Sequence, residues 1–220
     1  MLVTEAVRSR TSVRQFLEAP IPDDVMREIF NAAQMSPSNC NTQPWKTYVV
    51  SGEKKKALSA HLLEAVMSGN PPNPDFDWTV DYKGEHRDRQ IGAAFSLYNT
   101  LGIDREDRQA RGVTMLRNWE FFGAPHAVFF TMEKYLGIMG AVDLGIYAQT
   151  LALILRENGM GCCFQGALGQ YPDPVREVLG LSDDQGVLFG MSIGYPDLNA
   201  KINAARTDRE NVETAVNFVS

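Results

Sequence analysis

Apolar positions along the 220-residue chain alternate between helical and extended spacing, which predicts an α+β protein. Helices are predicted where apolar residues recur every three or four positions, at 2–7, 22–35, 52–66, 86–101, 104–119 and 173–179. Strands are predicted at shorter apolar runs, at 46–50, 127–132, 161–164 and 186–193. Residues 144–155 are apolar on nearly every side, which is typical of a buried helix, and 212–219 are amphipathic enough to dock as a terminal element.

No internal repeat or low-complexity tract divides the chain, so we predict a single domain over 1–220. The most loop-like segment is 69–75, which is rich in Pro, Asn and Gly. Phe76 and Trp78 follow at once, and a linker would not usually carry such side chains. We therefore interpret 69–75 as a long surface excursion and a candidate lid.

Composition and sequence layout argue against a nucleic-acid partner and against secretion or membrane insertion. The formal charge of −6 argues against nucleic acid, because no face-wide excess of Lys and Arg is available. The three cysteines, Cys40, Cys162 and Cys163, form no CxxC pair, which favours the reducing cytoplasm. The N-terminus lacks a signal-peptide layout, and no apolar run is expected to reach the length of a membrane span.

Two polar stretches are candidates for ligand binding. The segment 36–45, SPSNCNTQPW, places short hydrogen-bonding side chains between prolines, which suits a polar ligand and suits a well-capped connection equally. The run 8–16 alternates three arginines with Ser and Thr, groups that hold phosphate or a polarised carbonyl. Considered alone, such a run more often forms a solvated basic face of the protein than a ligand site.

Several familiar catalytic patterns are missing from the sequence. No GxGxxG follows a predicted strand, and no Walker lysine or GxSxG elbow occurs. His61, His86 and His126 have no metal-ligand spacing. Cys40 has no base that can be named beside it, which favours an incidental or buried thiol over a nucleophile.

Four motifs, taken in order, resemble the FMN-dependent nitroreductase family. They are RTSVRQF at 10–16, PSNCNTQPW at 37–45, FQGAL at 164–168 and NAARTDR at 203–209. The string RNWEFFGAP at 117–125 is similar to the branch that contains nitrobenzoate-reductase-like enzymes. The resemblance covers essentially the whole chain.

The resemblance implies which residues hold FMN. Arg10, Thr11 and Ser12 would bind its phosphate and ribityl end, with Arg206 as a second phosphate partner. Arg14 would lie beside N1 and O2 of the flavin, where a fixed positive charge stabilises the anionic reduced form.

Two further groups of FMN contacts follow from the resemblance. Contacts from the opposite subunit would come from Ser38, Asn39 and Asn41. The flavin ring near N5 and O4 would be faced by Gln165, Gly166 and Ala167. Glycine permits a close approach of the backbone to the ring. Candidates for an aromatic substrate wall are Trp119, Phe121 and Phe122, together with the 76–78 segment.

For the fold, the resemblance implies a sandwich around a mixed, mostly antiparallel sheet, in an interlocked homodimer. The long apolar helix would lie at the dimer interface, 69–122 would be a variable helical insertion, and 203–220 would be an arm that crosses to the partner. NADH or NADPH would reduce FMN, and a nitroaromatic or quinone-like acceptor would then be reduced in a ping-pong cycle. No side chain would act as a general acid or base.

Two alternatives stay open at this stage. The same flavin scaffold could serve another reduction, such as dehalogenation of a halophenol, or could serve flavin cleavage. The dehalogenating branch resembles the chain less, because its Glu-Tyr-Lys set has no convincing match within 70–120. The other alternative is a flavin-binding dimer without catalytic activity.

Overall fold

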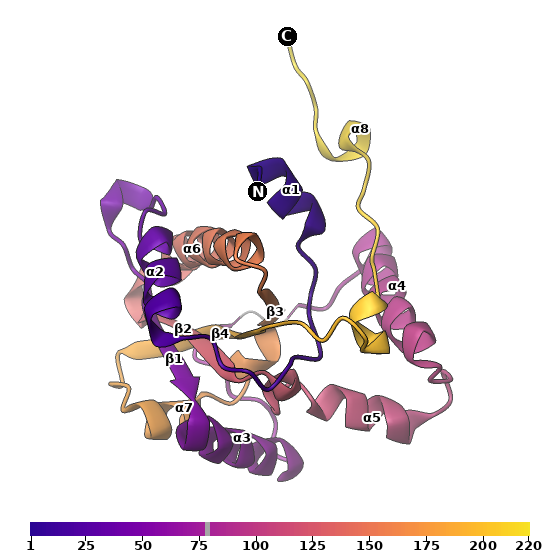
Figure 1. Cartoon of the computed structure of the whole chain (residues 1–220), viewed down its shortest axis with the longest axis horizontal. Coiled ribbons are helices and arrows are strands. Elements are labelled where there is room, and N and C mark those ends of the chain that lie inside the picture. Colours follow the sequence, from indigo (N-terminus) through magenta and orange to yellow (C-terminus); the bar gives the residue numbers. More distant parts are fainter. Residues whose placement is uncertain (78–79) are drawn as a thin grey trace.

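The computed structural model describes residues 1–77 and 80–220, and it has the predicted α+β class (Figure 1). The helices are α1 (Val3–Ser9), α2 (Asp23–Ala33), α3 (Gly52–Met67), α4 (Gly84–Leu101), α5 (Arg108–Leu116), α6 (Gly137–Glu157), α7 (Pro172–Leu179) and α8 (Val212–Ala215). The strands are β1 (Lys46–Ser51), β2 (His126–Glu133), β3 (Gly161–Gln165) and β4 (Gln185–Gly194).

The predicted second helix of the 86–119 region is shorter than its apolar pattern suggests. α5 begins at Arg108 because the Asp107 carboxylate accepts a hydrogen bond from the Ala110 backbone N–H at 2.9 Å and so caps the helix. Residues 104–107 therefore belong to the connection from α4. The terminal element α8 is a single helical turn with no buried residue.

The four strands form one antiparallel sheet in the order β1-β2-β4-β3. Side chains alternate along the buried strand β2. Val128, Phe130 and Met132 pack in the cluster that contains α2 and α6, whereas Ala127 and Phe129 pack with α3 and α7. The sheet is thus covered by helices on both faces, as Figure 1 shows.

The expectation that no apolar run reaches the length of a membrane span is wrong for α6. Residues 134–157 form a helical stretch long and apolar enough to cross a membrane. One face of α6 packs against the sheet and α2, and it is fully buried at Leu144, Tyr147, Leu151 and Leu155. Its apolar composition is therefore accounted for on that face by core packing. A second face is apolar and exposed in the single chain, at Ile138, Met139, Val142 and Ile146.

The candidate lid after 69–75 is docked onto the sheet at its described end. The Asp75 carboxylate lies 2.8 Å from both Lys134 Nζ and Arg176 Nη2, and it accepts the Val187 backbone N–H at 2.9 Å. Phe76 packs against the core cluster of α6. Residue 76 is therefore an anchor and not part of a mobile cover, while Trp78 lies outside the described residues.

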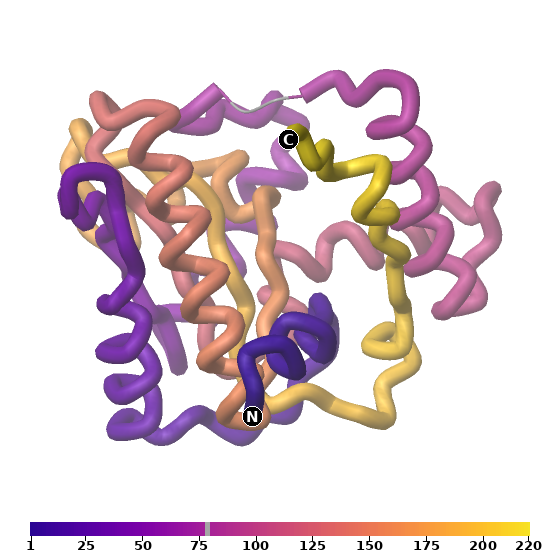
Figure 2. The backbone as a smooth tube through the Cα atoms, turned by 90° about the horizontal axis from the view of Figure 1, so that it is seen from above, coloured from indigo at the N-terminus to yellow at the C-terminus, as the bar shows by residue number. Residues whose placement is uncertain are grey.

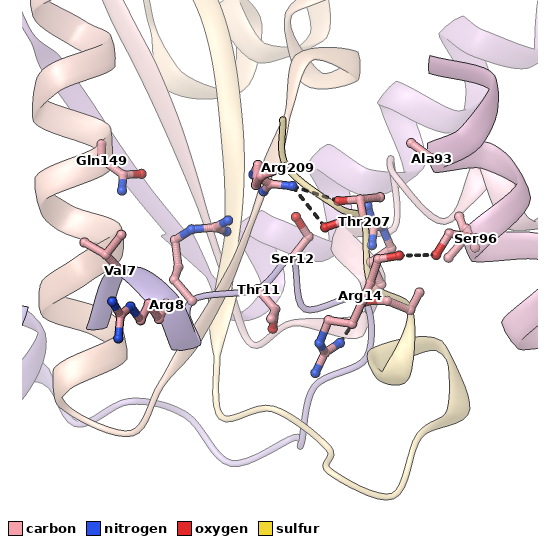
Figure 3. A pocket seen from close by; sticks show the side chains of 14 residues that line it. Val7, Arg8, Thr11, Ser12, Arg14, Ala93, Ser96, Gln149, Thr207 and Arg209 are labelled. Atoms are coloured by element: carbon pink, nitrogen blue, oxygen red, sulfur yellow. Dashed lines mark hydrogen bonds between the residues drawn. The ribbon is translucent and has the colours of Figure 1, made fainter. Parts of the chain in front are cut away.

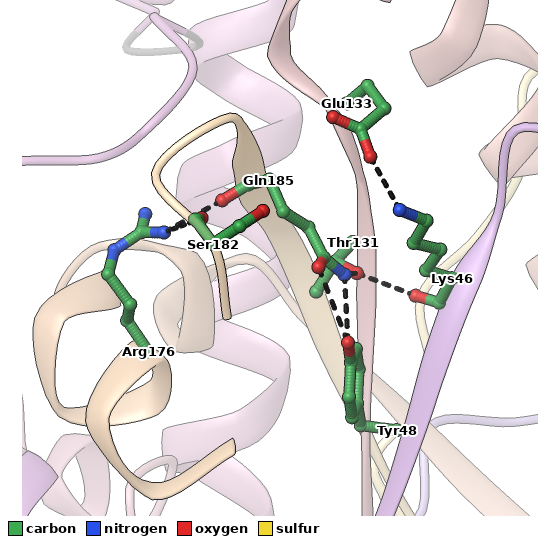
Figure 4. Close-up of polar contacts among 7 residues, drawn as sticks. All are labelled: Lys46, Tyr48, Thr131, Glu133, Arg176, Ser182 and Gln185. Carbon is green, nitrogen blue, oxygen red and sulfur yellow. Dashed lines mark hydrogen bonds and ion pairs between the residues drawn. The ribbon is translucent and has the colours of Figure 1, made fainter. Parts of the chain in front are cut away.

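A polar network closes the neighbouring end of the sheet (Figure 4). The buried Gln185 amide donates to Thr131 Oγ1 at 2.6 Å and to the Tyr48 hydroxyl at 3.1 Å. Thr131 donates in turn to the Lys46 carbonyl at 2.8 Å. Arg176 donates to the Gln185 carbonyl at 2.9 Å, which ties α7 to the start of β4. These bonds satisfy polar groups that burial would otherwise leave without partners.

His126 fixes the entry to α2 by a buried hydrogen bond. Its Nε2 accepts the backbone N–H of Ile21 at 2.9 Å, which requires the neutral imidazole. Burial lowers the pKa of His126 below its ordinary value of 6.5, and the nearby Lys55 ammonium lowers it further. Asp23 opposes the shift.

We predict that His126 makes the folded state sensitive to mild acid. Because the folded pKa is depressed, the stabilisation is present above about pH 6.5 and is lost as the pH falls through the folded value. His126→Gln keeps an acceptor but does not titrate. Between about pH 7 and 5, urea unfolding should show a larger loss of stability for the unmodified protein than for the variant. Equal losses would contradict this role.

Candidate functional site

The arginine-rich segment 10–16 lies along the edge of the sheet beside β3. Ser12 forms a parallel bridge with Cys162, and the Val13 N–H donates to the Cys162 carbonyl at 2.9 Å. This isolated bridge is parallel, whereas all pairs among the four strands are antiparallel. Gly161 permits the approach, because a Cβ there would lie 2.5 Å from Val13 Cγ2. The arginine-rich segment 10–16 and strand β3, which are far apart in the sequence, are thus adjacent.

Asn203 fastens the C-terminal motif to the same segment. Its Oδ1 accepts the backbone N–H groups of Arg14 at 2.7 Å and Gln15 at 3.2 Å. Its Nδ2 donates to the carbonyls of Gln15 at 2.7 Å and Asp197 at 2.8 Å. The side chain therefore replaces a missing sheet partner for 14–15 and brings Arg206 close. Sequence reasoning named the string 203–209 but not this residue.

Residues 117–125 are connected to the segment 10–16 and to β3 by two hydrogen bonds. Arg117 Nη2 donates to Gln15 Oε1 at 2.5 Å, and Gln165 Nε2 donates to the Asn118 carbonyl at 2.8 Å. Ser192 Oγ donates to Gln165 Oε1 at 2.5 Å. The Gln165 side chain is therefore buried and engaged within the protein. Only its backbone is left to meet a ligand, whereas Gly166 is exposed and Ala167 is half-buried.

A cavity of about 620 Å³ lies between α1, the segment 10–14, α4, α6 and the C-terminal arm (Figure 3). Its cationic lining residues are Arg8, Arg10, Arg14, Arg206 and Arg209. Its hydroxyl-bearing lining residues are Thr11, Ser12, Ser96 and Thr207. No Asp or Glu is among the lining residues, and within residues 1–77 and 80–220 none of these five arginines forms an ion pair.

The hydrogen-bond donors that line the cavity are of the kinds that bind anions. Arg206 is held in place by hydrogen bonds from Nη1 to the carbonyls of Asn203 at 2.7 Å and Ala205 at 2.8 Å. Ser96 Oγ on α4 donates to the Arg206 carbonyl, which closes the wall. Guanidinium and hydroxyl groups match phosphate oxygens, and each charge-assisted hydrogen bond contributes about 1.5–3 kcal/mol. The chemistry of the lining therefore fits a phosphorylated ligand.

The loop 37–45 is held by several contacts but lies outside the arginine cavity. The Asn39 N–H donates to the buried Asp143 carboxylate on α6 at 3.1 Å, and the Gln43 N–H donates to Ser38 Oγ at 2.9 Å. Trp45 stacks on Tyr147 with ring centroids 4.7 Å apart. Figure 2 shows this loop on the opposite side of α6 from α1, so within one chain Ser38, Asn39 and Asn41 do not reach the arginine cavity.

The loop also has an unusual backbone. Cys40, Asn41 and Gln43 adopt left-handed conformations with φ of 50°, 56° and 46°. Each such residue costs about 1–3 kcal/mol and persists only where the surroundings enforce it. Asn39, Cys40 and Asn41 remain exposed in the single chain. A strained, braced and exposed polar loop is typical of a binding element and not of a simple connection.

The candidate aromatic wall is only partly on a cavity surface. Trp119 and Phe121 are buried in the core cluster of α3 and α7, and Trp119 Nε1 donates to the Ala167 carbonyl at 3.2 Å. Both pack as core side chains in the single chain, and their assignment to a substrate wall stays a prediction. Phe122 is buried as well, in a small cluster with Val13 and Phe16, and it also borders a separate cavity of about 200 Å³ that Arg14 lines.

The cysteines do not supply a nucleophile to the cavity. Burial raises the pKa of Cys162 to about 12 and that of Cys163 to about 11. Both thiols are therefore protonated at neutral pH and behave as small apolar groups. Cys40 is exposed on the loop beyond α2, away from the arginine cavity.

Comparison with known proteins identifies the family. The model of the nitroreductase family matches residues 7–195. The chain belongs to the nitroreductase family. The family expected from the four motifs is thus confirmed.

Nitroreductase relatives include the 4-nitrobenzoate reductase of Pseudomonas putida, which is 36% identical over 213 residues, or 97% of this chain and 93% of the relative. A 4-nitrobenzoate reductase of Nocardioides sp. is 31% identical, over 97% of this chain and 88% of the relative. These two relatives agree with the branch indicated by the 117–125 string.

Solved structures match the whole fold. The FMN-dependent nitroreductase NfnB from Mycobacterium smegmatis, in complex with NADPH, superposes with a TM-score of 0.94 at 32% identity and covers 99% of this chain and 98% of its own. The FMN and NADPH-dependent NfnB from Sphigopyxis sp. strain HMH gives a TM-score of 0.96 at 31% identity, with both chains fully covered.

Proposed function

We propose that this nitroreductase-family protein is an FMN-dependent NAD(P)H oxidoreductase that reduces nitroaromatic or quinone-like acceptors. The observation that carries the proposal is the arginine and hydroxyl cavity, which lacks carboxylates among its lining residues and adjoins the β3 edge. The names of similar proteins support it, since they include 4-nitrobenzoate reductases and an FMN-dependent nitroreductase in complex with NADPH.

The cavity fits the phosphate end of FMN. Arg10 and Arg206 supply the two guanidinium groups, while the hydroxyls of Thr11 and Ser12 donate to the remaining phosphate and ribityl oxygens. The fit requires no rearrangement of charge, because no lining carboxylate has to be displaced. NAD(P)H would supply the electrons, and FMN supplies hydride chemistry when it is bound.

The remaining segments orient the ring and tune its electronics. Arg14 lines both the arginine cavity and the smaller cavity beside Phe122, so its charge can stabilise an anionic flavin. The backbone at 165–167 would face N5 and O4, with Gly166 exposed for close contact. The Gln165 side chain holds this turn in place through Asn118 and Ser192. Trp119, Phe121 and Phe122 remain the candidates for the aromatic substrate wall, and Phe122 borders the cavity that Arg14 lines.

The second subunit is part of this proposal. The exposed apolar face of α6 would be covered in a homodimer, because such a continuous stripe is unfavourable in water. The partner's braced loop would then supply Ser38, Asn39 and Asn41 to the FMN site. The apolar residues of the C-terminal arm, including Phe218, are exposed in the single chain, which fits an arm that crosses to the partner. The three free cysteines fit the cytoplasm.

Anaerobic titration tests the activity. FMN-loaded protein should lose its visible flavin absorbance when NADPH or NADH is added, and 4-nitrobenzoate, nitrobenzene or benzoquinone should restore it. Flavin that stays oxidised with both nucleotides would indicate a flavin-binding dimer without reductase activity. Faster turnover of a halotyrosine than of any nitroarene would favour the dehalogenating alternative.

The phosphate assignment predicts that Arg10→Ala with Arg206→Ala loses FMN while the fold survives. Two lost charge-assisted contacts should raise the FMN dissociation constant by about 10²- to 10⁴-fold. Fluorescence titration measures the binding, and far-UV circular dichroism measures the fold. Arg27→Ala, on the exposed surface of α2, is the matched control and should bind FMN normally. Stoichiometric flavin in the double variant would refute the assignment.

The subunit arrangement predicts that Val142→Glu on α6 dissociates the dimer and also weakens FMN binding. A charge buried without a partner should weaken association by more than about a hundredfold. Light scattering after size exclusion measures the mass. Met67→Glu, at an exposed position of α3 on the other side of the sheet, should stay dimeric. Full FMN affinity in a monomeric Val142→Glu protein would show that the partner's loop contributes nothing.

A further inference from the structure

A third cavity lies between the segment 9–13, the end of α6 and the start of β3. Its volume is about 150 Å³, below the roughly 300–1,000 Å³ of cavities that take drug-sized ligands, so it has room for a small ion and not for a nucleotide. α1 packs against α6 beside this cavity, and Figure 2 shows the two helices next to each other. We call it the Arg156 pocket, after the residue of the last turn of α6 that lines it.

The Arg156 pocket is lined by three arginines and by no carboxylate. Arg10, Arg156 and Arg206 contribute the guanidinium groups, and no Asp or Glu is among the lining residues. Within residues 1–77 and 80–220, none of the three arginines forms an ion pair. The C-terminal end of α6 adds only about half a negative charge. Most of the positive charge in the pocket is therefore uncompensated, which favours an anion as ligand.

Arg156 is held in place while its two terminal nitrogens stay available. Its Nε donates to Ser9 Oγ at 3.0 Å, and in the described part of the chain this is the guanidinium's one hydrogen bond. Both Nη groups can therefore donate to a ligand, and Ser9, which accepts here, keeps a hydroxyl proton to donate. Because the half-buried side chain is already fixed, an anion could bind it at a reduced entropic cost.

Asn203 closes the pocket without competing for the ligand. Its oxygen accepts two backbone N–H groups, and its amide nitrogen donates to two backbone carbonyls. The hydrogen-bonding capacity of this side chain is thus used within the protein, and Asn203 is a wall of the pocket rather than a ligand. Leu198, which also lines the pocket, is 86% exposed, so the pocket opens to solvent in the single chain.

The proposed FMN site does not account for the charge of this pocket. Arg156 lines the Arg156 pocket but not the arginine cavity, whereas Arg10 and Arg206 line both. The five arginines of the cavity and Arg156 carry six positive charges together. A phosphate monoester carries about −1.5 to −2 near pH 7. One phosphate group therefore neutralises at most about a third of this charge, and a second anion would be bound favourably.

We propose that the Arg156 pocket binds a second anion beside FMN, a tetrahedral dianion of the size of inorganic phosphate. Arg156 would bind two of its oxygens through the Nη groups, and the Ser9 hydroxyl would donate to a third. Arg10 and Arg206 would be shared between this anion and the FMN phosphate. The inference goes beyond the proposed reductase function, because it involves no electron transfer, and it rests on that function only in placing FMN in the arginine cavity.

Calorimetric titration of the FMN-loaded, full-length protein with inorganic phosphate, at constant ionic strength, tests the site. One phosphate should bind per chain, and acetate, a planar monoanion, should bind more weakly. Arg156→Gln should weaken phosphate binding at least about tenfold, the effect of one lost charge-assisted contact. Arg27→Gln removes the same charge from the exposed surface of α2 and should leave phosphate binding unchanged.

Two further variants separate ligand binding from a structural role of Arg156. Arg156→Lys keeps the charge but not the planar fork, so it should retain part of the affinity that Arg156→Gln loses. Ser9→Ala keeps all three guanidinium groups and should weaken phosphate binding less than Arg156→Gln does. Far-UV circular dichroism and the flavin content of each preparation report on the fold and on the FMN site, which Arg156→Gln should leave intact.

Phosphate binding that is unchanged in Arg156→Gln would overturn the proposal. The same holds if phosphate binds only to the flavin-free protein and FMN displaces it, because the pocket would then hold the phosphate of FMN itself. A protein that never retains FMN would instead contradict the proposed reductase function. In that flavin-free protein, phosphate binding that depends on Arg156 would still support the pocket, so the two failures are distinguishable.

Discussion

The packing of α6 on one face of the sheet is the interaction on which both halves of the site depend. Its fully buried side chains contribute about 1.5–3 kcal/mol each. Gly140 allows the close approach, because a Cβ there would lie 2.7 Å from Met132 Sδ on β2. From this fixed helix, Asp143 holds the loop 38–41, and Arg156 Nε donates to Ser9 Oγ at 3.0 Å just before the arginine segment. One packed helix therefore sets the positions of the two segments that we propose bind FMN, which lie on its opposite sides.

Collecting five arginines around one cavity carries an electrostatic cost in the empty protein. The cost is moderated by water in the open cavity and by the acidic remainder of a chain whose formal charge is −6. An anion that enters relieves the repulsion and gains hydrogen bonds, so its binding to the folded state stabilises the protein. The hydrogen bond from the Arg14 N–H to Asn203 Oδ1 and that from Ser96 Oγ to the Arg206 carbonyl hold this arrangement before the ligand arrives. The site is thus preorganised, which lowers the entropy that binding has to offset.

Local patterns predicted most of the elements, and long-range contacts explain the rest. The apolar run at 127–132 predicted β2 because a strand buried on both faces needs no polar alternation. The Asn203 bonds to residues 14–15 span 188 or more positions, so no local signal could reveal them. The aromatic cluster at 119–122 was ambiguous because the same residues suit a core and a pocket. All three aromatic side chains, Trp119, Phe121 and Phe122, are buried in the single chain, and Phe122 also borders a cavity that Arg14 lines.

The segments bonded to the sheet and the α4–α5 hairpin differ in how firmly they are held. The cofactor segments are joined to the sheet by backbone bridges and buried amides such as Gln165, whose rearrangement would disturb the core. α4 has no buried residue, and its described contacts to the rest of the protein run largely to the Lys201–Ala204 turn and the arm. Regions with few buried contacts open and change at low energetic cost. Side chains on α5 can therefore vary without disturbing the sheet, whereas α4 is tied to the arginine cavity through Ser96.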